Sequence, residues 1–306
     1  MSALDVYVED YLRLRRALGY KMERHGLLLP QLVGYLEAAG ATTVTSDLAI
    51  AWARLPMRAR PNHWAARLAV ARGFARYLTT IDPMTEVPPP GVFPARRHRP
   101  APYLWSPEEI CRLLEEARAL PSPLRAATYE ALFGLLATTG MRVGEAVGLE
   151  RDDVDLRAGV VTIREAKFDR SRLVPLHPST TEALSDYAAK RDRLCPRPRS
   201  TAFFLSAVGT RLERSAVDKT LRKITTSMGI RTTSVRPRAH DLRHSLAVGT
   251  LTGWLRAGVN VDEHMADLTT YLGHVSPADT YWYLSASPEL MALAAERLDT
   301  RYGATQ

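Results

Sequence analysis

The chain has 306 residues, which suits one large or two ordinary domains, and 46% of them are hydrophobic, enough to form buried cores. It has two cysteines, Cys111 and Cys195, which excludes a disulfide framework and a cysteine-built metal knuckle. Charged residues begin at Asp5 and no run of about 18 apolar residues occurs, so we expect no secretory signal, no membrane-spanning helix and a cytoplasmic location.

The net charge of +8 indicates an anionic partner, such as nucleic acid or a membrane surface. Surplus arginine on a soluble protein would explain it equally well. The charge is unevenly distributed, because only four of the 41 Lys and Arg but eight of the 33 Asp and Glu lie from His240 onward. The basic surface is therefore expected in the first three quarters of the chain.

Apolar periodicity predicts four helices within residues 1–80. They are expected at residues 4–18, 28–39, 45–52 and 64–78. Gly19 and Gly40 end the first two, and Thr45 or Ser46 can cap the third. This region contains ten arginines. Either contact with a phosphate backbone or ordinary solubility would account for them.

Residues 81–102 are predicted to form a linker, because seven prolines remove backbone donors and disfavour helix. This segment also carries the basic run Arg96, Arg97, His98 and Arg99. Such a run could cross a phosphate backbone, or it could simply keep a spacer solvated.

A second domain is expected over residues 103–306, mainly helical with a small β-sheet. Ser106, Pro107 and Glu109 form a helix start with a capping box. A buried apolar helix over Leu124–Thr139 ends at Gly140. Residues 160–165 and 172–176 alternate as two strands of a hairpin whose turn carries Lys167, and further helices are expected at residues 179–194, 215–228 and 240–255.

His240 and Arg243 lie three residues apart, which places them on one face of a helix. A guanidinium fits two oxygens of one phosphate, and an imidazole can move a proton near neutral pH. The pair is half of a phosphate-handling site, although such pairs also occur by chance.

Four further pieces stand in order along the second domain: the run Thr139-Gly-Met-Arg142-Val-Gly-Glu145, the hairpin residue Lys167, the triplet Leu272-Gly273-His274, and Tyr283 nine residues later. Together with His240 and Arg243, they make this domain resemble the tyrosine recombinases of the phage-integrase type. Each motif is weak alone, but their joint order and spacing are highly specific. The first domain and linker match the DNA-clamping half of these enzymes more loosely.

The resemblance implies a helical, SAM-like core-binding domain over residues 1–80, a Pro-rich basic linker over 81–102, and an α+β catalytic domain with a C-terminal helix over 103–306. It implies a site-specific recombinase or integrase, serving a mobile element, that acts on double-stranded DNA as a homotetramer and is a monomer or dimer when free. Arg96, Arg97 and Arg99 are the expected DNA contacts of the linker.

The resemblance also assigns roles in the chemistry. Arg142 and Arg243 would neutralise the phosphate, Glu145 would position Arg142, and His240 and His274 would reach the phosphate, with His240 as proton acceptor. Lys167 would act as general acid, and Tyr283 would attack phosphorus to form a 3′-phosphotyrosyl link. No metal, ATP or other cofactor is expected.

Several alternatives remain open at this point. Tyr271 and Tyr281 compete with Tyr283, and Arg170 and Arg172 compete with Lys167. A type IB topoisomerase shares the chemistry, and a DNA-binding module without catalysis is also conceivable. His240 and His244 imitate a zinc-binding pair, although Arg243 between them would repel a dication. His244 is otherwise expected to be structural, and His264 is expected in an irregular segment.

Overall fold

The computed structural model describes residues 2–94, 101–164, 171–285, 290–293, 295 and 296. These residues divide into two compact units, one up to residue 94 and the other from residue 101 onward. Each unit has its own hydrophobic core. No helix among the described residues is both long and apolar enough to cross a membrane.

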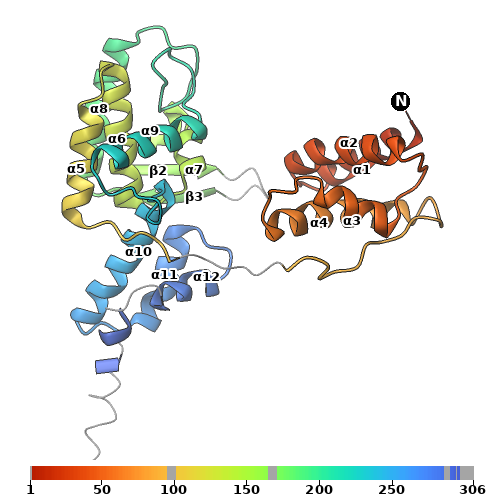
Figure 1. Cartoon of the computed structure of the whole chain (residues 1–306). Coiled ribbons are helices and arrows are strands. Elements are labelled where there is room, and N and C mark those ends of the chain that lie inside the picture. The colour runs from red at the N-terminus through yellow and green to blue at the C-terminus, as the bar shows by residue number, and fades with distance from the viewer. Residues whose placement is uncertain (1, 95–100, 165–170, 286–289, 294, 297–306) are drawn as a thin grey trace, which may run out of the picture. The chain divides into compact units, whose positions relative to one another are not determined.

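The first unit consists of four helices, α1 (Ala3–Ala17), α2 (Glu23–Ala38), α3 (Ser46–Arg54) and α4 (Pro61–Leu78) (Figure 1). Thr45 caps α3 as expected, through a hydrogen bond that its hydroxyl accepts from the Leu48 amide. The core is built from large side chains that are almost fully buried: Leu29, Leu32, Leu36, Trp52, Leu68 and Phe74. The Arg67 guanidinium lies 3.9 Å from the centre of the Trp52 ring and donates to the Trp52 carbonyl.

The first part of the predicted linker packs against this unit. The Glu86 amide donates to the Val44 carbonyl at 2.8 Å, and the Arg72 guanidinium donates to the carbonyls of Pro88 and Pro89, each at 2.7 Å. Phe93 is buried in the helical core. Prolines remove donors but keep their carbonyls, so Arg72 can hold this segment in place.

The second unit begins with α5 (Pro107–Arg118), α6 (Pro123–Thr139) and α7 (Val143–Gly148). The predicted capping box of α5 is confirmed, and α6 ends at Gly140 in the left-handed conformation with φ of 61°. The long helix α6 packs against α5, α8 (Pro178–Leu194) and α10 (Ala239–Arg256), which makes it the central helix of this unit (Figure 1).

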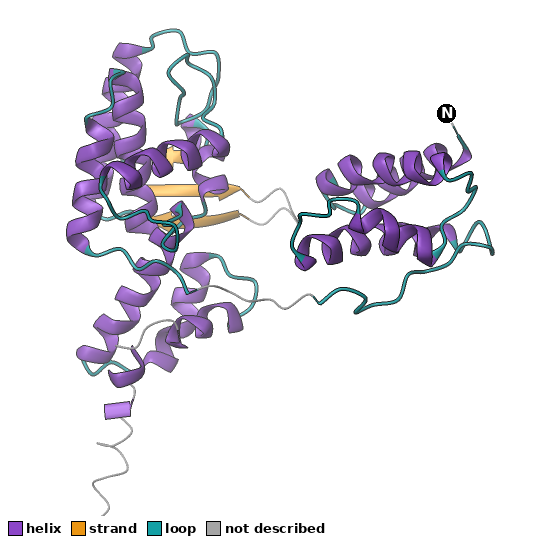
Figure 2. Cartoon of the chain, viewed as in Figure 1, coloured by secondary structure: helices purple, strands orange, loops and turns teal. Residues whose placement is uncertain are grey.

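A three-stranded antiparallel sheet follows α7 and a short 3₁₀ turn, η1 (Arg151–Asp153) (Figure 2). Its strands are β1 (Val154–Asp155), β2 (Val160–Arg164) and β3 (Ser171–Pro175), in the order β1-β2-β3. Val161 pairs with Val174, and both side chains face the core. The predicted hairpin is confirmed, whereas β1 was not predicted.

The remaining helices are α9 (Arg214–Ser227), α11 (Val261–Leu272) and α12 (Ala278–Tyr281), and the 3₁₀ turn η2 (Trp282–Ser285) follows. The expectation of an irregular segment around His264 was wrong, because α11 contains this residue and Asn260 caps that helix. The unit is mainly helical with a small sheet, as the sequence predicted.

Candidate active site

Five of the six residues predicted to be catalytic lie among the described residues, all in the second unit. They come from the ends of four elements: Arg142 precedes α7, His240 and Arg243 lie in the first turns of α10, His274 follows α11, and Tyr283 lies in η2. The sixth, Lys167, and the linker residues Arg96, Arg97 and Arg99 lie outside the described residues.

Arg142 is held by the local geometry of the helix that it starts. Its amide donates to Glu145 Oε2 at 2.8 Å, and its guanidinium donates to Glu145 Oε1 at 2.7 Å. A second guanidinium donor, Nη2, reaches the Gly273 carbonyl at 2.9 Å. Glu145 therefore both caps α7 and fixes the direction of the arginine, and Arg142 connects this cap to the residue before His274.

A second arginine, Arg172 of β3, shares the same carboxylate. Its Nη2 lies 2.8 Å from Glu145 Oε2, and its side chain is only 14% exposed. Burial raises the pKa of Glu145, but hydrogen bonds from Arg172 and Arg142 outweigh this effect and hold the pKa below its usual value. Sequence reasoning considered Arg172 only as a substitute for Lys167 and missed its link to Glu145.

Gly273 lies where these two arginines meet. It has φ of 67° at the C-cap of α11, and a Cβ placed there would lie 2.5 Å from Arg172 Cζ. The glycine is needed both for its backbone conformation and for the space that the guanidinium occupies. The Leu-Gly-His motif thus places His274 directly after Gly273, which contacts Arg142 at the start of α7 and Arg172 of β3.

Arg243 is almost completely buried and points to the end of α6. Its Nη1 donates to the Gly140 carbonyl at 2.8 Å, whereas its Nε and Nη2 have no hydrogen-bond partner within the described part of the chain. Burial lowers the pKa of Arg243, but arginine keeps its charge at any physiological pH. The site therefore contains a buried cation that interacts with the Tyr283 phenol and still has unused donor capacity, as an anion-binding site requires.

The geometry distinguishes Tyr283 from its competitor Tyr281. Tyr283 is 2% exposed, while Tyr281 is 43% exposed and its hydroxyl lies 3.3 Å from Asp262 Oδ1. Tyr283 stacks on His274 with ring centres 5.9 Å apart, and its ring lies 5.4 Å from that of His244. Burial raises the pKa of Tyr283, and the charge of Arg243 opposes this rise. Tyr283 is thus the tyrosine that faces the arginine.

Three histidines belong to this cluster, and each has a lowered pKa. Burial is the main cause for all three, and nearby cations add to it: burial and Arg243 lower the pKa of His240, and they bring that of His274 to about 4. The pKa of His244 falls to about 3, and its ring meets the His240 ring edge-on at 4.6 Å. All three are therefore neutral at pH 7 in the DNA-free protein. His244 lies in α10 and its ring packs on Tyr283, which is consistent with the structural role expected of it.

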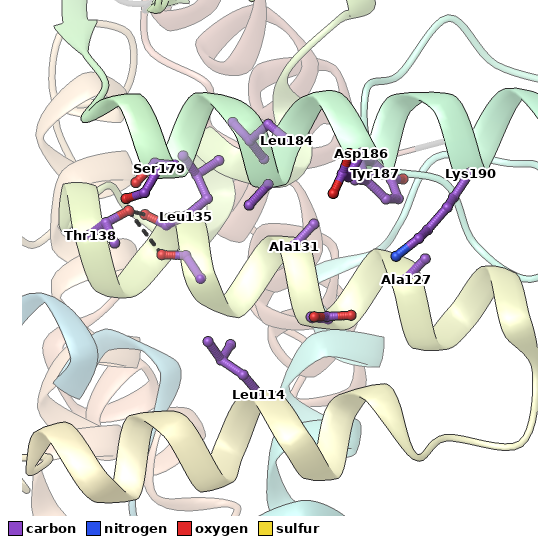
Figure 3. Close-up of a pocket in the computed structure, with 14 residues that line it drawn as sticks. Leu114, Ala127, Ala131, Leu135, Thr138, Ser179, Leu184, Asp186, Tyr187 and Lys190 are labelled. Atoms are coloured by element: carbon purple, nitrogen blue, oxygen red, sulfur yellow. Dashed lines mark hydrogen bonds between the residues drawn. The ribbon is translucent and has the colours of Figure 1, made fainter.

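One other feature, a pocket, lies apart from this cluster. A pocket between α5, α6 and α8 is lined mainly by apolar side chains such as Leu114, Ala131, Leu135 and Leu184, with Lys190 at one end (Figure 3). None of the five described residues predicted to be catalytic lines it. Within the described ranges, no group of three His, Cys, Asp or Glu side chains is placed to hold a metal ion.

Comparison with known proteins agrees with this arrangement. The phage integrase family model matches residues 105–289. A Sinorhizobium fredii protein named as an integrase/recombinase, y4rB, is 43% identical and the match covers 99% of both chains. Tyrosine recombinase XerD of Mycobacterium tuberculosis is 36% identical over 72% of this chain and 68% of its own.

The fold is likewise shared with a solved structure. The Tn1549 transposon integrase, determined in complex with transposon right end DNA, aligns with a TM-score of 0.64 at 15% identity, covering 97% of this chain and 99% of that one. At 15% identity this similarity shows a shared fold alone. The family is shown by the match of the family model and by the two relatives described above, which are 43% and 36% identical. The chain therefore belongs to the phage integrase family, and it is a tyrosine-type site-specific recombinase.

Proposed function

We propose that this recombinase cleaves and rejoins double-stranded DNA through a 3′-phosphotyrosyl intermediate formed on Tyr283. The observation that carries the proposal is the burial of this phenol beside the Arg243 guanidinium, between two histidine rings. A phenol has a pKa of about 10, so it needs a cationic pocket to act as a nucleophile at neutral pH.

In the proposed reaction, the Tyr283 oxygen attacks phosphorus and the bond from phosphorus to the 5′-oxygen breaks. The phenol proton passes to His240, whose lowered pKa leaves it neutral and able to accept it. Lys167 gives a proton to the leaving 5′-oxygen. Arg142 and Arg243 bind the non-bridging oxygens, whose charge grows in the transition state. The reverse steps rejoin the strand.

This chemistry requires neither ATP nor a metal ion. The phosphotyrosyl bond conserves the energy of the phosphodiester, so no nucleotide needs to be hydrolysed for religation. The two arginines supply the positive charge that a bound cation supplies in other phosphoryl-transfer enzymes.

We further propose that the partner is double-stranded DNA, held as a homotetramer on two duplexes by a protein that is a monomer or dimer when free. The net charge of +8 and the basic run containing Arg96, Arg97 and Arg99 favour backbone contacts. The complex of the Tn1549 integrase with a transposon end supports a mobile element as the source of the DNA.

The test uses DNA from candidate element ends, with a nick beside the cleavage position so that the covalent product is trapped. Tyr283→Phe should bind this DNA normally but form no protease-sensitive adduct, and Tyr281→Phe is the matched control that should retain it. Adduct formation should persist in excess EDTA. An adduct that survives in Tyr283→Phe but disappears in Tyr281→Phe would contradict the assignment.

A further inference from the structure

An arginine begins α10 in the same way that Arg142 begins α7. The amide of Arg238, the N-cap residue, donates to Asp241 Oδ2 at 2.7 Å, and its Nη2 donates to Asp241 Oδ1 at 2.7 Å. At the start of α7, the amide and the guanidinium of Arg142 hold the Glu145 carboxylate in the same manner. The sequence patterns singled out Arg142 for phosphate binding, but they did not single out Arg238.

The Arg238 guanidinium has one edge on a buried acid and is otherwise open to solvent. Asp241 is 1% exposed, whereas the side chain of Arg238 is 52% exposed. Nε and Nη2 of Arg238 face the carboxylate, and Nη1 has no hydrogen-bond partner within the described ranges of the chain. A guanidinium has five donors, so it can bind a second group that carries oxygen atoms while the pair with Asp241 stays intact.

Arg238 lies at the edge of the candidate active site. Burial is the main cause of the lowered pKa of His240, and the charges of Arg238 and of the two arginines predicted to be catalytic add to it. Asp241 acts in the opposite direction. Arg243, in the same first turns of α10, is buried with unused donor capacity, which points to an anion on this side of the helix.

The chain that leads to Arg238 is fixed in place. Arg231 donates from Nη2 to the carbonyl of Pro237, which is buried, and from Nε to the Thr225 hydroxyl of α9 at 2.9 Å. Arg238 therefore follows an anchored residue, and the cap on Asp241 fixes its own backbone. Donors that are held in place before binding lose less conformational entropy when a ligand arrives.

We propose that Arg238 is a third phosphate-binding arginine, which contacts a DNA backbone phosphate next to the one that is cleaved. The proposal rests on the proposed function, in which His240 acts at the cleaved phosphate. Asp241 would hold the Arg238 guanidinium during this contact, as Glu145 holds that of Arg142. A contact of this kind positions the DNA strand but carries no sequence information.

The first experiment separates this role from mere neutralisation of the buried Asp241. Arg238→Ser/Asp241→Asn removes both charges, so the net charge of the chain is unchanged, and serine still caps a helix well. Arg118→Ser/Glu130→Gln is the matched control. Arg118 also donates from Nε and Nη2 to one carboxylate, but its partner Glu130 lines the pocket that lies apart from the candidate active site.

Fluorescence anisotropy measures binding to duplex DNA from candidate element ends, over a range of salt concentrations. All forms also carry Tyr283→Phe, so that no adduct forms. The Arg238 double variant should bind about 10-fold more weakly. Its slope of log affinity against log salt should be shallower by about 0.9, the value for one phosphate contact. The control should bind as tightly as Tyr283→Phe alone. The proposal would be overturned if both double variants lost affinity equally, or if neither did.

The second experiment changes the DNA instead of the protein. A neutral methylphosphonate replaces, in turn, each phosphate that flanks the cleavage position. At one of the two positions it should weaken binding by Tyr283→Phe and by the control, but it should have no further effect on the Arg238 double variant. Effects that multiply independently at both positions would contradict the contact.

The melting temperature of each form reports whether it folds. Arg238→Gln, which keeps a donor for Asp241, replaces the double variant in both experiments if that variant proves unfolded. Absence of the covalent adduct in every form that retains Tyr283 would count against the proposed function instead, because neither binding measurement involves cleavage.

Discussion

At the scale of single residues, the two arginines of the site differ in how they are held. Arg142 is tied to a carboxylate and a carbonyl, whereas Arg243 is buried with two nitrogens that have no hydrogen-bond partner in the described chain. An ammonium group cannot reproduce the fork of donors that a guanidinium can offer to a phosphate. Substitution by lysine should therefore impair activity at both positions for the same reason, although their surroundings differ.

We expect Arg142→Lys and Arg243→Lys each to slow formation of the covalent adduct by about 100- to 1,000-fold, which corresponds to about 3–4 kcal/mol of lost transition-state stabilisation. Single-turnover cleavage of nicked DNA at saturating protein measures this effect separately from binding. A lysine variant that cleaves at a near-normal rate would show that charge alone is sufficient at that position.

Arg172 provides a test of the shared carboxylate. Arg172→Leu should lower the free energy of unfolding by about 1–3 kcal/mol, because it leaves the largely buried Glu145 with one guanidinium partner instead of two. Denaturant titration measures the change, and the cleavage rate should fall with it, since Glu145 orients Arg142.

Arg151→Leu is the matched control for that experiment. Arg151 also makes a two-pronged ion pair, with Asp192, but both side chains are about half exposed. A solvated pair of this kind contributes about 1 kcal/mol or less. If the two substitutions proved equally mild, Glu145 would not depend on Arg172.

At the scale of secondary-structure elements, local signals were sufficient where the cause is local. Ser106, Pro107 and Glu109 lie within one helical turn, and the structure confirms the capping box that they predict. Gly140 follows the apolar run of α6 and adopts the left-handed conformation that ends a helix. In both places, neighbouring residues in the chain determine the outcome, so the sequence is enough to predict it.

Elements fixed by distant partners could not be predicted in this way. Strand β1 has two residues and exists through its pairing with β2. Helix α2 begins five residues before the apolar run at Leu28, after Met22 in a left-handed conformation, and it accommodates Pro30. The bonds from Arg172 to Glu145 and from Thr280 to His274 join residues whose spacing shows no periodicity. The sequence showed the predicted catalytic motifs and the contact between Glu145 and Arg142, but it did not show the contacts that Arg172 and Thr280 make.

The end of α6 offers a prediction at this scale. Gly140→Ala should destabilise the second unit by more than Gly229→Ala. Both glycines have positive φ, so both changes cost about 1–2 kcal/mol in backbone strain. At Gly140, however, the new Cβ would also lie 2.9 Å from Leu246 Cδ2, while the space around Gly229 is empty to 4 Å. That overlap should add about 1–3 kcal/mol. Equal losses in denaturant titration would contradict this packing argument.

At the scale of the whole molecule, the buried histidines should make stability depend on pH. The pKa of His244 is about 3 and that of His274 about 4 in the folded protein, against an ordinary value of 6.5. Between these values the unfolded chain binds more protons than the folded one. Stability should therefore be complete above about pH 6.5 and should decrease as the pH falls from there toward 3.

Thermal unfolding of the wild type and of His244→Asn across pH 4 to 8 measures this effect. Carboxylates also titrate at the acidic end, so the difference between the two proteins isolates the histidine. The variant should have a shallower decline in melting temperature below pH 6.5. Parallel curves would mean that protonation of His244 is not linked to unfolding.

The unpartnered donors of Arg243 imply a trade-off between stability and activity. A buried charge without a directly paired counter-ion opposes folding, and under the proposed function the phosphate of the substrate would complete its hydrogen bonds. Without DNA, the protein is thus less stable than its packing alone would allow. Arg243→Met should be inactive yet at least as heat-stable. Sulfate stabilises proteins in general, so it should raise the melting temperatures of both forms, but that of the wild type by more, because only the wild type can bind the anion at Arg243. Selection for stability alone would therefore favour inactive variants of this enzyme.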